Sequence, residues 1–132
     1  MKKETLKFIV LLLVAIGAGP AAAKMWNWST TAATNATADP TINWSEGMSP
    51  SSVNDSARAM MAVLAKWRND ISAANTTAGT STAYTLATSE GVSTTPNDGQ
   101  MISFIANATS GGSPTLTVDG GNTYPLWLGG AV

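Results

Sequence analysis

The chain has 132 residues, no cysteine, no histidine and a formal net charge of −1, a length that suits one domain or two small ones. This composition excludes disulfide bonds, histidine- and cysteine-based catalysis and the common zinc and copper sites. The weak charge argues against a nucleic-acid partner, because contact with phosphates requires a basic surface.

Residues 1–23 have the pattern of a secretory signal peptide. Lysines cluster in the first seven residues, an apolar run covers residues 8–19, and small residues end the segment at Ala23. The run has 12 residues, fewer than the roughly 20 that a helix needs to cross a bilayer. An uncleaved anchor is therefore the weaker interpretation. Cleavage after Ala23 leaves four basic and seven acidic residues, a net charge of −3.

Residues 24–50 predict an extended or irregular arm. The segment is rich in Thr, Ala and Asn, is interrupted by prolines, and holds three of the five tryptophans, Trp26, Trp28 and Trp44. We expect each indole to anchor a loop on a neighbouring surface. A platform on which a sugar stacks is the less favoured alternative.

Residues 51–74 predict an amphipathic, coiled-coil-like helix, with helical residues at about 53–72, Ser52 as the N-cap and Asp55 three positions later. Apolar or small residues recur there at alternating steps of four and three, which is the spacing of a heptad seam. The seam consists of Val53, Ala57, Met60, Leu64, Trp67 and Ile71.

This seam has two interpretations. It can pack against its own domain, as amphipathic helices of globular proteins usually do, or it can pack against other copies of the chain. Large apolar residues are scarce elsewhere, and Met61 and Ala65 widen the apolar face, so we favour an oligomer interface made by the six seam residues. Because so short a seam is not a stable coiled coil alone, neighbouring segments must contribute.

Residues 80–132 predict a small antiparallel β module, a sandwich or barrel-like unit. Strands are expected at 84–87, 101–106, 115–118 and 123–126, separated by turns that contain glycine. Alternation of apolar and polar residues predicts a core of Ile102, Phe104, Leu116 and Val118. The fold class is therefore α+β. The apolar stretch that ends at Val132 suggests either an edge that a partner buries or, as the favoured interpretation, a natural chain that continues further.

The sequence favours no enzyme, cofactor or metal site. Asp39, Asp55, Asp98 and Asp119 stand in turn or cap contexts, where local backbone hydrogen bonds explain them. No glycine-rich loop with a lysine is present to hold a phosphate. The residues from Asp119 onward offer too few oxygen ligands for calcium. No catalytic, cofactor-binding or metal-binding residue is expected.

Two segments carry a resemblance to a known class. DPTINWSEGMSPSSVNDSARAMMAVLAKWRNDI, residues 39–71, resembles the N-terminal region of phage and prophage tail-fibre-like proteins. DGQMISFIANATSGGSPTLTVDGGNTYPL, residues 98–126, resembles a β module of tail fibres.

The resemblance implies a homotrimeric structural protein of the virion tail, with residues 53–71 near the threefold axis. Its partners would be other copies of the chain and other tail proteins. A host surface receptor would be contacted through regions that this chain lacks.

The leader departs from that pattern, because virion proteins assemble in the cytoplasm. Three explanations of the leader remain open: a start codon assigned too far upstream, a domesticated prophage gene, or an exported bacterial surface protein, periplasmic or extracellular. The alternative function is then a secreted or surface-attached bacterial binding module, with glycans as one candidate ligand. A small exported protein of unrelated role is the third hypothesis.

Overall fold

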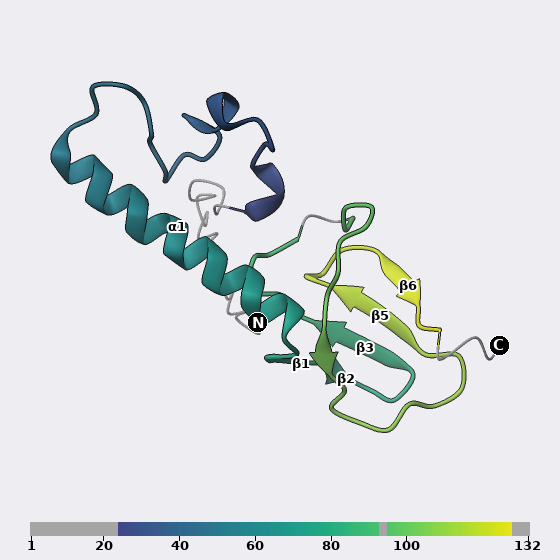
Figure 1. Ribbon diagram of the computed structural model, residues 1–132. Coiled ribbons are helices and arrows are strands. Elements are labelled where there is room, and N and C mark those ends of the chain that lie inside the picture. The colour runs from purple at the N-terminus through teal and green to yellow at the C-terminus, as the bar shows by residue number, and fades with distance from the viewer. Residues whose placement is uncertain (1–23, 93–94, 128–132) are drawn as a thin grey trace, which may run out of the picture.

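The structure is a computed structural model that describes residues 24–92 and 95–127. It is confirmed as α+β: a long helix carries the N-terminal arm along one side and a small β module at its C-terminal end (Figure 1). The signal-peptide-like leader and the last five residues of the apolar C-terminal stretch lie outside the described residues.

The helix α1 spans Pro50–Ile71 and begins three residues before the expected start at residue 53. Ser49, not Ser52, is the N-cap, and its side chain accepts a hydrogen bond from the Ser52 backbone N–H at 3.3 Å. Pro50 follows as the first helical residue, where its fixed φ suits the helix and its missing N–H is not needed. Proline thus starts the helix here.

The arm folds back on α1 and includes two short 3-10 helices, η1 at Met25–Asn27 and η2 at Ala32–Asn35. Ile42 from the arm and Val63 from the helix are the buried centre of this contact. Ser56 fixes the arm further, because its hydroxyl donates to the Asn43 carbonyl at 3.1 Å and accepts from the Asn43 N–H at 2.9 Å. The expected irregular arm is therefore tied to the helix.

The β module contains a four-stranded sheet in the order β2-β3-β5-β6 and a separate two-stranded pair, β1-β4. The strands are β1 (Asn75–Thr76), β2 (Ala78–Gly79), β3 (Ala83–Leu86), β4 (Phe104–Ile105), β5 (Thr115–Val118) and β6 (Thr123–Pro125).

The expectation of an antiparallel module was wrong for two pairings, since β3 with β5 and β1 with β4 run parallel. The long segment between β3 and β5 returns the chain to the same end of the sheet, which parallel neighbours require. The pairs β2-β3 and β5-β6 are antiparallel.

The expected strand 101–106 is reduced to Phe104–Ile105. Before it, the Ser103 N–H donates to the carbonyl of Asp70 at 2.7 Å. That hydrogen bond ties the segment to the end of α1 instead of to a neighbouring strand, which shortens the strand.

The core of the β module lies between β3 and β5. Tyr84 pairs with Leu116 and Leu86 with Val118 in the parallel register, and all four side chains are buried. Ile102 and Phe104 are partly buried and pack against this cluster, together with Val92, Ala108 and Leu126. The four residues proposed from alternation therefore lie together, two at the centre and two at its margin.

The turn between β5 and β6 follows its sequence signature. Asp119 and Gly120 have φ of 49° and 71°, the positive values that two-residue hairpin turns favour. The Asp119 carboxylate also reaches across the module, accepting from the backbone N–H groups of Thr88 and Val92, both at 2.7 Å. Its role thus exceeds the local turn predicted for it.

The turn from β2 to β3 depends on Gly79, which has φ of +86° and whose missing Cβ would lie 2.3 Å from the Ala83 carbonyl oxygen. We predict that Gly79→Ala destabilises the fold by about 2 kcal/mol more than Gly99→Ala, because only the first change adds a backbone clash to the strain of positive φ. Gly99 is the matched control, with φ of +79° and no atom within 4 Å of the place that a Cβ would occupy. Urea denaturation measures both, and equal losses would contradict the prediction.

Candidate self-association surface

The Asp70 carboxylate fixes the direction in which α1 leaves the β module. Its Oδ1 accepts from the Asn75 side chain at 2.7 Å and from the Ser89 N–H at 2.6 Å, while Oδ2 accepts from the Glu90 N–H at 3.0 Å. The residue is only 4% exposed. A buried carboxylate with this many donors is held in one geometry, so the helix end is rigidly joined to the loop after β3.

Glu90 extends this junction to the arm. Its Oε1 accepts from the backbone N–H of Met25 at 2.8 Å, and the residue is also 4% exposed. The end of α1, the loop after β3 and the start of the arm therefore meet at one buried polar cluster. Its two acidic members had been assigned no role from the sequence.

The spacing of the buried residues along α1 is one sequence pattern that indicates this junction. Ser56, Val63 and Asp70 are the buried residues of α1 and lie seven residues apart. Two of the three are polar, so a search for apolar periodicity passes over the stripe. Their hydrogen bonds to Asn43 and to the β module make polar side chains suitable for burial.

The predicted seam lies on a different face of the helix. At 3.6 residues per turn, it is displaced from the buried stripe by roughly a quarter of a turn. Val53 is 44% exposed, Leu64 42% and Trp67 38%. Ala57, Met60 and Ile71 are partly buried, and Met60 packs against the core formed with the arm. The protomer thus covers one stripe of α1 and leaves much of the seam open.

Two further apolar side chains continue the open face beyond the helix. Trp26 is 45% exposed and Met101 is 66% exposed. With Trp67 and Ile71 they border a hollow of about 240 Å³, and Glu90 lies in its wall. The surface formed by the seam together with Trp26 and Met101 is called the seam surface below.

The tryptophans of the arm therefore differ in their roles. Trp28 is half-buried and packs against the core that Ile42 and Val63 form, as expected of an anchor. Trp26 and Trp44 keep 45% and 37% of their surface exposed, so much of each ring remains available for contact with another molecule.

Charged contacts are few among the described residues. The one ion pair between described residues joins Arg58 and Asp55 at 3.4 Å, and both side chains are largely exposed.

Within residues 24–92 and 95–127, no group of three or more acidic side chains could hold a metal ion. Among the same residues, no helix combines the length and apolarity that crossing a lipid bilayer requires.

Comparison with known protein families, curated proteins and solved structures gives no match. A functional proposal therefore has to start from the sequence and the surfaces of the chain itself.

We predict that Asp70→Ala lowers the free energy of unfolding by about 2–6 kcal/mol, because two backbone N–H groups lose their partner at about 1–3 kcal/mol each. Asp55→Ala is the control on the same helix. Its carboxylate is largely exposed in the Arg58 ion pair, so it should change stability by only about 0.5 kcal/mol. Urea denaturation followed by circular dichroism measures both. Similar losses from the two variants would show that Asp70 does not join the helix to the module.

Proposed function

We propose that this chain is a non-catalytic structural component of a phage or prophage tail fibre, assembled as a homotrimer through the seam surface. The single observation that carries the proposal is the exposure of Val53, Leu64 and Trp67 along one stripe of α1. Each is a large apolar side chain on one side of the helix, although Ala57 and Met60 between Val53 and Leu64 are partly buried. Exposed apolar surface of this kind marks association sites.

A comparison of the free energy gained by burying the seam with the free energy that association costs indicates an interface that extends beyond the helix. Full burial of a large apolar side chain stabilises by about 1.5–3 kcal/mol, so covering the exposed part of these three gives about 1 kcal/mol each. Three copies then gain about 9 kcal/mol, whereas joining them takes two association steps that cost an estimated 4–15 kcal/mol each. Trp26 and Met101, beside the C-terminal end of the seam, supply the further apolar surface that stable assembly needs.

The trimer and the virion tail come from the resemblance of residues 39–71 and 98–126 to tail-fibre-like proteins. In this arrangement, the three α1 helices lie near a threefold axis and the β modules lie at one end of the bundle. The partners are other copies of the chain and other tail proteins. Any contact with a host receptor is made by other parts of the fibre.

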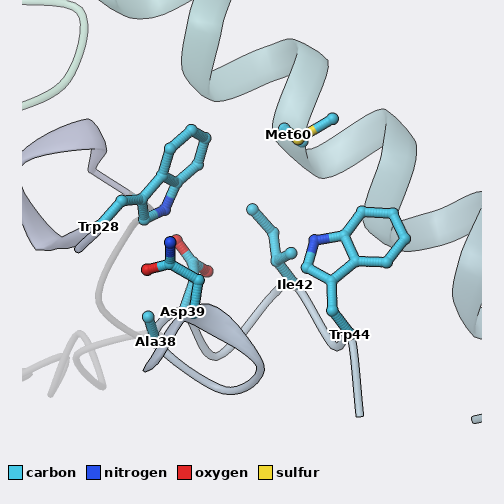
Figure 2. A pocket seen from close by; sticks show the side chains of 7 residues that line it. Trp28, Ala38, Asp39, Ile42, Trp44 and Met60 are labelled. Carbon is cyan, nitrogen blue, oxygen red and sulfur yellow. The ribbon is translucent and has the colours of Figure 1, made fainter. Parts of the chain in front are cut away.

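The second candidate is an exported, surface-attached binding module. The observation that favours it is a pocket between the arm and α1, bordered by Trp28 and Trp44 (Figure 2). Finding the chain in purified virions supports the fibre, whereas finding it processed in the periplasm supports the binding module.

We predict that Leu64→Asp converts the full chain from a trimer to a monomer, because association would bury an ionised carboxylate among apolar neighbours. Since Leu64 is 42% exposed in the protomer, the variant should keep its helical circular dichroism spectrum. Light scattering coupled to gel filtration measures the mass.

Ala62→Asp is the matched control. It adds the same charge two residues away, at an exposed position on another side of α1, and should leave the trimer intact. A compact monomer for the unmodified chain would overturn the proposal. Equal dissociation by both variants would count against the seam as the interface.

A further inference from the structure

Asp39, which has one buried carboxylate oxygen without a hydrogen-bond partner, borders a pocket between the arm and α1. Figure 2 shows the rings of Trp28 and Trp44 on either side of Ile42, with Asp39 below Trp28 in this view and Met60 approaching from the helix. The pocket has a volume of about 160 Å³. Its walls are mostly indole rings and aliphatic groups.

The two carboxylate oxygens of Asp39 differ in their hydrogen bonding. Oδ1 accepts from the Thr41 N–H at 2.8 Å and from the Thr41 hydroxyl at 2.7 Å, which stabilises the turn. Oδ2 is buried and has no hydrogen-bond partner among the described residues, and Asp39 as a whole is 4% exposed. The turn accounts for one oxygen of this carboxylate and leaves the other unexplained.

The neighbouring polar side chain is already engaged. Asn35 accepts from the Ser29 N–H and donates to the Ser29 carbonyl, both at 2.8 Å. Neither lysine nor arginine borders the pocket among the described residues. The carboxylate therefore has no cationic partner there, although buried charges in proteins are usually paired.

We propose that this pocket binds a primary alkylammonium group, such as a small aliphatic amine or a lysine side chain. The ammonium would donate a charge-assisted hydrogen bond to Asp39 Oδ2. The indole faces of Trp28 and Trp44 attract a cation, and the side chains of Ile42 and Met60 suit its methylene groups. An apolar cavity of about 150 Å³ holds benzene, so a chain of about five non-hydrogen atoms matches the available volume.

A positive charge distinguishes this ligand class from a sugar. A sugar would supply hydroxyl donors to Oδ2 but would leave the negative charge of the carboxylate uncompensated. The alkylammonium group satisfies the hydrogen bond and the charge together. This inference does not depend on the tail-fibre proposal, because the pocket lies within one protomer.

The test is titration of the full chain with n-butylammonium chloride, followed by the indole N–H signals of Trp28 and Trp44 in nuclear magnetic resonance. Matched titrations use 1-butanol and sodium butyrate, which keep the alkyl chain but change the head group. We expect binding of butylammonium at least about tenfold tighter than of either control, the ratio that about 1.4 kcal/mol of charge-dependent interaction gives. If 1-butanol bound as tightly as butylammonium, the proposal would be overturned, and this result requires only the unmodified chain.

Asp39→Asn is the variant that isolates Oδ2. It retains an oxygen for Thr41 and replaces the free oxygen with an amide NH2, which repels an ammonium donor. We expect it to lose butylammonium binding at least about tenfold, while Asp98→Asn, at an exposed turn, keeps it. Unchanged affinity in a folded Asp39→Asn variant would contradict the assignment.

The source of the amine is distinguished by a second ligand, lysine blocked at its α-amino and carboxyl groups. Affinity equal to or above that of butylammonium supports a lysine side chain of a partner protein. Weaker binding of blocked lysine, with butylammonium still selected over 1-butanol, supports a free amine.

Discussion

The arrangement of this protein depends on the Asp70 carboxylate. It lies in the last turn of α1 and accepts hydrogen bonds from Asn75, Ser89 and Glu90, so one side chain joins the helix to β1 and to the loop after β3. Glu90 then binds the backbone of Met25, which brings the arm to the same point. Apolar contacts alone would permit the helix to slide or rotate, whereas directional bonds to a buried charge define one orientation.

That orientation separates two faces of α1. The stripe of Ser56, Val63 and Asp70 is buried within the protomer, and part of the seam beside it stays exposed. Both initial interpretations concern the seam, whereas the stripe that is buried within the protomer lies beside it. Among the described residues, apolar side chains gather in one cluster under the arm and another between β3 and β5, and few others are placed to cover the seam.

Sequence patterns predicted the elements better than their connections. The helix, the glycine turns and the alternation in β5 are set by interactions between near neighbours, so periodicity and turn residues predict them. The parallel pairing of β3 with β5 was not predicted, because pairing direction depends on the route of the intervening chain. The start of α1 after Ser49, earlier than expected, was not predicted either. Asp70, Glu90 and Asp39 were missed as buried groups, because their partners or surroundings come together only in the folded chain.

The absence of cysteine from the chain permits a direct measurement of whether the seams of separate copies face one another. Single cysteines introduced by Leu64→Cys and by Ala62→Cys can be treated with a short bifunctional maleimide at low protein concentration. If the seams face one another, we expect rapid joining of copies through position 64 and little through position 62, as resolved on a denaturing gel. Failure of position 64 to join copies, or equal joining at both positions, would contradict that arrangement.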